Sequence, residues 1–277
     1  MAMVIVDTHP HIYSEDEGRY PPIDKPYRPP AGTGTVGHLR REMQANSVSK
    51  AVVIQTSTFY RWDNRFICDT VQANPHWCTG VVTLNPEDPH SPDLLYALVK
   101  KYGVRGLRSI TTSDRRYDHP GVRALWSEAR GLGIVVNSLI NLEQADELGR
   151  LLEAFPDLPV VLDHCLNLAA GDRFQATLRK VLDLARYPNL HAKLTFIPTG
   201  SAQPYPCRDM LDPCKRIIEA YGPDRCVWGS DFPCELWCPK VTSTQHLRIF
   251  THELGLSQSA QEAILGQTAL RLWFSPR

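Results

Sequence analysis

The sequence has no excess of either charge, no long apolar run and no C-x-x-C pair of cysteines. Its 30 basic and 30 acidic side chains give a formal net charge of +0, so charge provides no reason to expect binding to nucleic acid or to an anionic membrane. No apolar stretch approaches the roughly 20 residues of a membrane-spanning helix. The opening residues, MAMVIVDTHPHIY, lack the basic start and longer apolar segment of a secretion signal. We therefore expect a cytoplasmic protein.

The eight cysteines are scattered along the chain, and several lie in apolar runs. This distribution favours reduced thiols over disulfides. Cys234 and Cys238 follow Asp231 closely and suggest part of a metal knuckle, but no second cysteine pair completes such a site. We therefore expect free thiols.

Eight short apolar runs alternate with helical patterns. The runs are residues 4–11, 51–56, 80–84, 104–110, 133–140, 160–164, 190–196 and 226–231, and the helices between them include 94–102, 120–132, 142–155 and 173–187. Near-continuous apolar runs are typical of parallel strands buried on both faces. The pattern predicts an α/β fold, a (β/α)₈ TIM barrel with two extra C-terminal helices at about 243–254 and 259–274. An open doubly wound sheet is the alternative, but no G-x-G-x-x-G follows the first run.

The chain has 277 residues, and a barrel needs about 250, so we expect one domain spanning residues 1–277. Residues 15–37 contain five prolines and form a long irregular loop after the first strand. In a barrel this loop lies on the catalytic face. We expect it to act as a partial lid, and the alternative is an arm used in packing or oligomerisation.

Histidine and aspartate side chains stand where three of the runs end. His9 and His11 are two residues apart, so in a strand they project from the same face. His164 ends the sixth run and Asp231 the eighth. Barrel closure makes the first and last strands neighbours and brings these groups to one rim. Imidazole and carboxylate groups are common ligands of divalent metals, so the four residues predict a shared site. Alone, His164 could be a core residue and Asp231 a helix cap.

Arg108 should point into the barrel from the fourth strand, where its planar fork suits a substrate carboxylate; an ion pair with a barrel acid is the alternative. Other candidates for substrate contact are Tyr60, Arg61 and Trp62 after the second strand, Asn137 or Ser138 on the fifth, and His191 and Lys193 on the seventh. The last two could instead be structural. The remaining histidines (38, 76, 90, 119, 246 and 252) are expected at the surface.

The motifs DTHPH, VLDH and GSDFP resemble those of the amidohydrolase superfamily. The closer resemblance is to the amidohydrolase-2 branch, which includes 2-pyrone-4,6-dicarboxylate lactonase. Residues 63–75, GVRGLR and NLHAKL look most like its lactonase group, and the resemblance spans residues 4–274. Pro10 departs from the pattern, because small or polar residues usually separate the two histidines.

The resemblance implies a hydrolase with one divalent metal, Zn²⁺ before Mn²⁺, although some relatives work without a metal. It also implies that Arg108 holds an acidic substrate. We expect Asp231 to act as general base, with His164 beside it, while water opens a lactone or similar ester-like bond of a small anionic substrate. The first alternative is a non-oxidative decarboxylase of an aromatic or unsaturated acid. The second is an inactive barrel that acts as a binding protein. The sequence also leaves open whether the protein forms a homo-oligomer.

Overall fold

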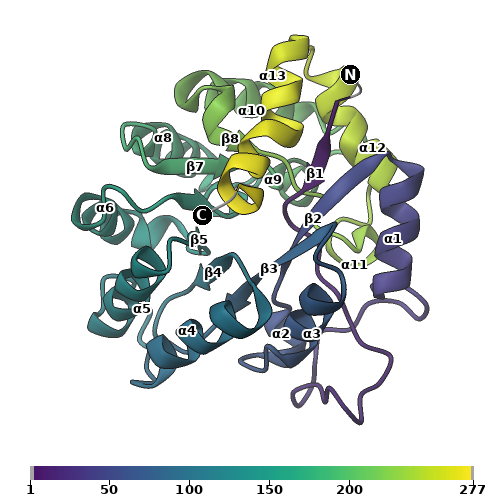
Figure 1. The fold of residues 1–277 in the computed structure, drawn as a ribbon. Coiled ribbons are helices and arrows are strands. Elements are labelled where there is room, and N and C mark those ends of the chain that lie inside the picture. Colours follow the sequence, from purple (N-terminus) through teal and green to yellow (C-terminus); the bar gives the residue numbers. More distant parts are fainter. Residues whose placement is uncertain (1–2, 276–277) are drawn as a thin grey trace.

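Eight parallel strands form a single sheet in which each strand pairs with the next along the chain (Figure 1). The computed structural model describes residues 3–275. The strands are β1 (Ile5–Asp7), β2 (Val48–Ile54), β3 (Cys78–Thr83), β4 (Gly106–Ser109), β5 (Val135–Ser138), β6 (Val160–Leu162), β7 (Leu190–Lys193) and β8 (Cys226–Val227). The two edges meet just beyond β1 and β8, where the Trp228 carbonyl accepts from Thr8 N at 3.3 Å and from Thr8 Oγ1 at 2.6 Å. The sheet therefore curls as in a (β/α)₈ barrel.

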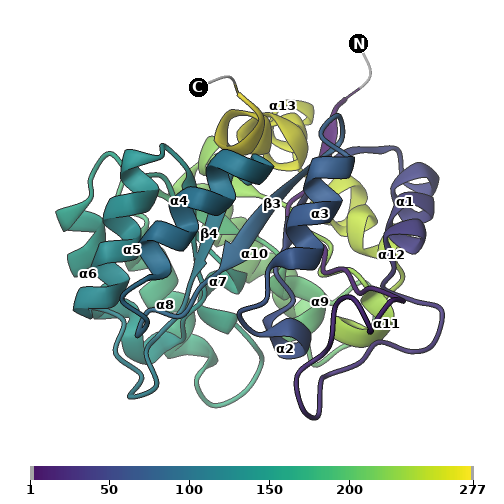
Figure 2. The ribbon, with the colours of Figure 1, turned by 60° about the horizontal axis from the view of Figure 1, so that its bottom comes forward.

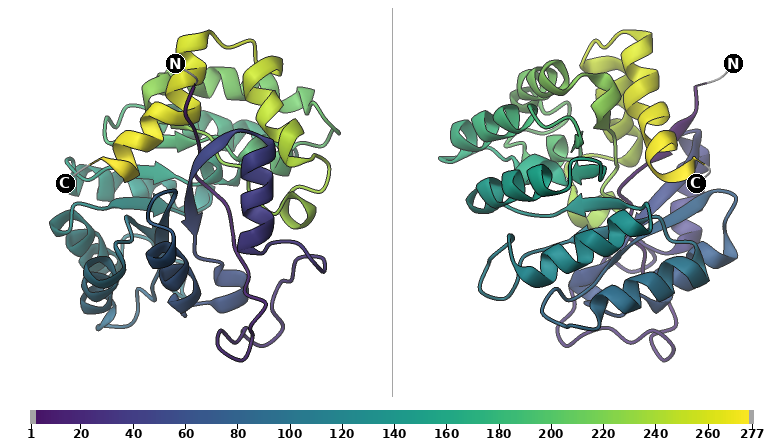
Figure 3. Two further views of the ribbon diagram at one scale, coloured as in Figure 1. Left: turned by 45° about the vertical axis from the view of Figure 1, so that its right-hand side comes forward. Right: turned by 60° about the vertical axis from the view of Figure 1, so that its left-hand side comes forward.

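Helices surround the sheet on its outer side, as Figures 2 and 3 show. The longer ones are α1 (Val36–Ala45), α3 (Arg65–Ala73), α4 (Ser91–Tyr102), α5 (Pro120–Gly131), α6 (Ala145–Ala154), α8 (Phe174–Leu184) and α10 (Arg208–Tyr221). Their ends follow simple chemistry: α4 carries a proline in its first turn and stops at Gly103, whose φ of 70° suits a residue without a Cβ. Within residues 3–275, no helix has the length and apolar character needed to cross a membrane.

Short helices occupy the carboxyl end of the barrel and the C-terminal region. They are α2 (Ser57–Tyr60), α7 (His164–Asn167), α9 (Phe196–Gly200), α11 (Cys234–Trp237), α12 (Ser243–Arg248) and α13 (Gln258–Glu262), with π-helical turns at Ile249–Glu253, Ala263–Gln267 and Leu270–Phe274. The elements after β8 thus form the two helical stretches anticipated near residues 243–254 and 259–274.

The barrel interior is filled by branched apolar side chains and closed at its amino end by Trp273. The interior cluster comprises Val6, Val52, Ile54, Val81, Val135, Val161, Val227, Ala269 and Leu272 around that indole. Trp273 is 1% exposed, and a Cβ on Gly106 would lie 3.4 Å from its Nε1. Burying each such side chain stabilises the fold by about 1.5–3 kcal/mol, so the strands are held rigidly beneath the site.

The proline-rich segment lies at the carboxyl end of the barrel, beside α2 and α11 (Figure 2). Backbone bonds hold it there: Ile23 N donates to Phe59 O at 2.8 Å, and Tyr27 N donates to Thr58 O at 3.1 Å. The irregular part ends at Thr35, which caps α1, so the last two residues of the predicted 15–37 loop are helical.

Two histidines expected at the surface are buried, which corrects that prediction. His246 is 0% exposed, and its Nδ1 accepts from Trp228 Nε1 at 3.0 Å. His38 is 9% exposed, and its Nδ1 accepts from Gly34 N at 3.1 Å. Both lie on helix faces that pack inward, where a backbone or indole N–H satisfies the ring nitrogen. All eight cysteines are free and buried, as predicted.

Candidate active site

Asp7 ties the segment after β1 to the segment after β8. Its carboxylate accepts from His9 N at 3.1 Å, from Ser230 N at 2.9 Å and from Ser230 Oγ at 2.6 Å. Gly229 makes the close approach possible, because a Cβ there would lie 2.6 Å from His9 Cβ. The two halves of the site, separated by more than 200 residues in the sequence, are thereby locked together.

The predicted His9, His11 and Asp231 come together at this junction. His9 Nε2 lies 3.5 Å from Asp231 Oδ1. Burial lowers the pKa of His9 and of His11 well below the usual value, so both rings are neutral. Burial also raises the pKa of Asp231 to about 8, although Arg108 opposes the shift. The strands end at Asp7 and Val227, so all three side chains project from the loops beyond them, and Asp231 has a left-handed φ of 55°.

His164 reaches the same place through an unusual backbone turn. Strand β6 ends at Leu162, and four successive residues, 164–167, then have positive φ values of 53°, 48°, 62° and 54°. A left-handed conformation costs roughly 1–2 kcal/mol per non-glycine residue, so the surrounding packing must impose it. The turn sets His164 Nδ1 at 2.7 Å from Thr195 Oγ1 and at 3.5 Å from Asp231 Oδ2. Burial lowers the pKa of His164 to about 3, so this ring is neutral too.

A cluster of buried charges lies directly beneath these rings. Asp163 accepts from Arg108 Nε at 3.0 Å and from Asn137 Nδ2 at 3.1 Å, and Lys193 Nζ lies 3.0 Å from its other side. Burial alone would raise the pKa of Asp163, but Lys193 and Arg108 outweigh it and lower the value to about 2. Lys193 Nζ also contacts His9 Nδ1 at 3.1 Å. We call Arg108, Asp163 and Lys193 the ion cluster.

The donor set fits a divalent metal in type and spacing. His9, His11 and Asp231 are the group within residues 3–275 whose ligand atoms all lie within 4.8 Å of one another. His11 Nδ1 faces the Ile54 carbonyl at 3.1 Å, so it carries the proton and leaves Nε2 free to ligate. Lys193 Nζ donates to His9 Nδ1 at 3.1 Å, so the neutral His9 ring carries its proton on Nε2, towards Asp231. His9 would ligate through Nε2 with this proton moved to Nδ1, which breaks the Lys193 contact. His164 is outside this group.

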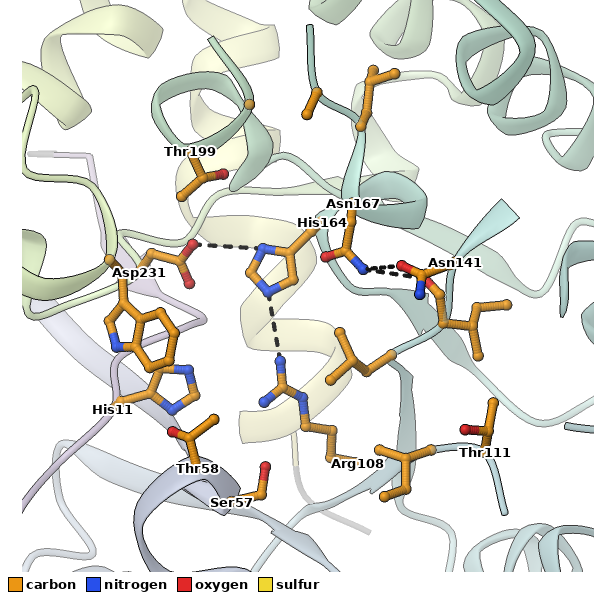
Figure 4. A pocket seen from close by; sticks show the side chains of 17 residues that line it. His11, Ser57, Thr58, Arg108, Thr111, Asn141, His164, Asn167, Thr199 and Asp231 are labelled. Carbon is orange, nitrogen blue, oxygen red and sulfur yellow. Dashed lines mark hydrogen bonds and ion pairs between the residues drawn. The ribbon is translucent and has the colours of Figure 1, made fainter. Parts of the chain in front are cut away.

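A cavity of about 660 Å³ opens above the site (Figure 4). Its inner end, which we call the floor, is formed by His11, Arg108, His164 and Asp231. The polar side chains around this floor, which we call the wall, are Ser57, Thr58, Thr111, Asn141, Asn167 and Thr199. Aliphatic groups from the loops after β4, β5 and β6, together with Trp237, complete the lining. Tyr27 of the proline-rich segment packs on Trp237 with ring centroids 5.1 Å apart.

Several residues predicted to contact substrate lie behind the cavity lining. Tyr60 is buried, and its hydroxyl accepts from Ser14 N at 2.7 Å. Ser138 is buried, and its Oγ accepts from Tyr117 at 2.8 Å. Arg61 is exposed and lies over Trp62. Lys193 is enclosed in the ion cluster. Of the described residues predicted as candidates for substrate contact, Arg108 is the one that lines the cavity.

The functional residue most clearly missed by sequence reasoning is Asp163. An aspartate at the end of an apolar strand is costly to bury without a partner, and that signal was available in VLDH. The wall residues were also missed, because they belong to loops that carry no motif.

Comparisons with known proteins agree with this geometry. The family model described as "Amidohydrolase" matches residues 6–274. The L-fucono-1,5-lactonase of Burkholderia ambifaria is 24% identical over 238 residues, covering 82% of this chain and 80% of that protein.

Solved structures share the fold. A probable 2-pyrone-4,6-dicarboxylic acid hydrolase from Acinetobacter baumannii has a TM-score of 0.82 at 19% identity, covering 98% of this chain and 99% of that one. A zinc-bound amidohydrolase from Burkholderia multivorans has a TM-score of 0.77 at 19% identity, covering 99% and 100%. The curled parallel sheet, the clustered histidines and aspartate, and the match along nearly the whole length lead to one conclusion: the chain belongs to the amidohydrolase family.

Proposed function

We propose that the protein hydrolyses a small lactone, with Asp231 as general base. The observation that carries the proposal is a buried carboxylate held 3.5 Å from two neutral imidazoles, His9 and His164, at the end of a cavity. The similarity to a lactonase supports a ring ester as the substrate. A cavity of about 660 Å³ suits a single small ring with its substituents.

Asp231 is suited to take a proton from water. Burial raises its pKa to about 8, and a carboxylate of higher pKa is a stronger base once it is deprotonated. The rings of His9 and His164 lie beside its two oxygens, each at 3.5 Å. Water attacks the ring carbonyl carbon while its proton passes to Asp231. The ring C–O bond then breaks, and the leaving oxygen takes that proton back, which yields a hydroxy acid.

His9, His11 and Asp231 would hold a divalent metal, with His164 as the neighbouring imidazole. Nitrogen and oxygen ligands suit Zn²⁺, and Mn²⁺ accepts the same set. When bound, such an ion polarises the carbonyl and lowers the pKa of water towards about 7. The zinc bound in the Burkholderia multivorans structure supports this assignment.

We further propose that the proline-rich segment restricts solvent access to the cavity. Tyr27 packs on Trp237, and Trp237 packs on His11 with ring centroids 5.4 Å apart. This aromatic stack links the segment to a floor residue, which supports a lid in place of a free arm. Excluding water strengthens the electrostatic interactions at the floor.

The test is product analysis on a panel of small lactones and aromatic acids. We expect one hydroxy acid per lactone consumed, one atom of ¹⁸O from labelled water in its carboxylate, and no CO₂. Release of CO₂ from an acid, with no ring opening, would replace the proposal by a decarboxylase. Binding without turnover of either class would identify an inactive barrel. Elemental analysis identifies any bound metal, and activity measured before and after chelation shows whether the reaction depends on it.

A further inference from the structure

Arg108 is the one lysine or arginine side chain among the described residues that line the cavity. It projects inward from the end of β4 and is 5% exposed. Figure 4 shows its guanidinium pointing to His164, with His11 on one side of it and Asn141 and Asn167 on the other. The positive charge therefore belongs to the floor, and the wall carries none.

The ion cluster fixes the direction of this guanidinium. Its Nε donates to Asp163 Oδ2 at 3.0 Å, and Lys193 holds the other oxygen of that carboxylate. One edge of the fork is therefore occupied. Nη2 extends into the gap between His9 Nε2, at 3.4 Å, and His164 Nε2, at 3.5 Å.

This placement does not suit a substrate carboxylate distant from the reacting carbon. Asp231 Oδ1 lies 3.5 Å from the same His9 Nε2 that Arg108 Nη2 approaches at 3.4 Å. A group bound to the free Nη atoms therefore lies beside Asp231, within reach of the water that Asp231 activates. That is the position of the reacting carbonyl and not of a distant substituent.

We infer that Arg108 is a catalytic residue that donates hydrogen bonds to the oxygen of the reacting carbonyl. The inference rests on the proposed lactone hydrolysis and adds an oxyanion donor to it. As the water oxygen bonds to the carbonyl carbon, the C=O electron pair moves onto the carbonyl oxygen. At the same time a proton of the water moves to Asp231. Arg108 stabilises that oxyanion. When the pair returns, the ring C–O bond breaks and the leaving oxygen takes the proton from Asp231.

The same charge distribution defines the class of substrate. With its cation used at the carbonyl, the described lining leaves neutral groups to bind the rest of the ring. Asn167 Nδ2 donates to Asn141 Oδ1 at 2.7 Å, which leaves one amide donor and one amide acceptor for the ligand. Thr199 adds a hydroxyl on the side of the cavity where Asp231 lies (Figure 4). Such groups match hydroxyl substituents, so the substrate is an uncharged, hydroxylated lactone.

The test compares two lactones of the same ring size, one uncharged and hydroxylated, the other carrying a carboxylate substituent. Wild-type protein should prefer the uncharged lactone. Arg108→Ala should lower kcat on both by about 10²–10³-fold, the usual loss of an oxyanion donor, with KM changed less than kcat. Added guanidinium ion should restore part of the kcat of Arg108→Ala. Arg108→Lys keeps the charge and replaces the alanine variant if that variant does not fold. Its kcat should fall by the same factor on both lactones.

The opposite pattern would overturn the inference. If kcat on the uncharged lactone stays at the wild-type value while KM rises for the carboxylated lactone alone, Arg108 binds a remote carboxylate. A wild-type preference for the carboxylated lactone would overturn the substrate class. Failure of the proposed function looks different, because the wild-type protein would then open neither lactone, and the inference would fall with it.

Discussion

The floor and the wall of the cavity are built in opposite ways. The floor consists of a guanidinium, a carboxyl group and two imidazoles that lie on a strand or within four residues of a strand end, and each contacts another side chain or backbone group of the barrel. The wall consists of amides and hydroxyls on loops, and Asn141, Asn167 and Thr199 are exposed. Rigid placement suits groups that meet developing charge, because preorganised dipoles cost no rearrangement during the reaction. Loops tolerate change, which suits recognition. The contrast assigns chemistry to the floor and specificity to the wall.

The largest effect should come from the base on the floor. Asp231→Asn keeps the shape of the side chain but cannot accept a proton from water. We expect kcat to fall by about 10²–10⁴-fold, the usual contribution of a positioned base. Steady-state kinetics with a melting curve checks this. A folded variant with normal turnover would remove Asp231 from the mechanism.

The ion cluster beneath the floor should matter for stability. Asp163→Asn leaves Arg108 and Lys193 buried without their shared counter-charge, and we expect a loss of about 3–5 kcal/mol in the free energy of unfolding. The matched control is Asp157→Asn, whose exposed pair with Arg130 should contribute about 0–1 kcal/mol. Denaturant unfolding of both variants measures the difference, and equal losses would show that the cluster stabilises no more than a surface pair.

The same carboxylate predicts how stability depends on pH. The pKa of Asp163 is lowered to about 2 in the folded protein, against about 3.9 in an unfolded chain. Its contribution is therefore complete above about pH 4 and is lost as the pH falls towards 2. The free energy of unfolding of Asp163→Asn should therefore fall less than that of the wild-type protein between about pH 4 and pH 2.

The floor should also impose a pH profile on the reaction. Asp231 is active as a carboxylate, and burial raises its pKa to about 8. In metal-free protein, kcat should therefore rise about tenfold per pH unit below 8 and level off above it. Bound metal should shift the rising part of this profile to lower pH, because a nearby cation lowers the pKa of the Asp231 carboxyl group. A flat profile between pH 6 and 9 without metal would contradict the assignment.

The wall should give the smallest effects, seen in binding. Asn141→Ala or Asn167→Ala removes one hydrogen-bonding group each, worth about 0.5–1.5 kcal/mol. We expect KM to rise by up to about tenfold with kcat nearly unchanged, since the contact is equal in the ground and transition states. A large fall in kcat from either variant would contradict the assignment of binding to the wall and chemistry to the floor.

The sequence was sufficient to predict the alternation of strands and helices and the meeting of His9, His11 and Asp231. Strand ends fix which groups share a rim, and closure joins β1 to β8 whatever their separation along the chain. All eight predicted runs overlap observed strands, but each strand ends before its predicted run does, by four residues at β1 and β8 and by one to three residues at the others. Pro10 cannot donate to a ladder, and the chain turns away after Leu162.

Other parts of the site depend on contacts that no local pattern encodes. The left-handed turn at 164–167 contains no glycine, and of its residues asparagine alone commonly tolerates such a φ. Lys193 was a candidate for substrate contact with a structural role as the alternative, and its partners Asp163 and His9 come from distant parts of the chain. Which inward residue meets substrate and which meets another charge is decided by packing in three dimensions.

The most direct test of this division is a crystal structure with a lactam analogue of the best lactone substrate, which binds but resists hydrolysis. We predict the lactam carbonyl at the floor, with its oxygen facing Arg108 and its carbon on the side of Asp231, and the ring substituents against Asn141 and Asn167. A lactam bound with its carbonyl against the wall, away from Asp231, would contradict the account.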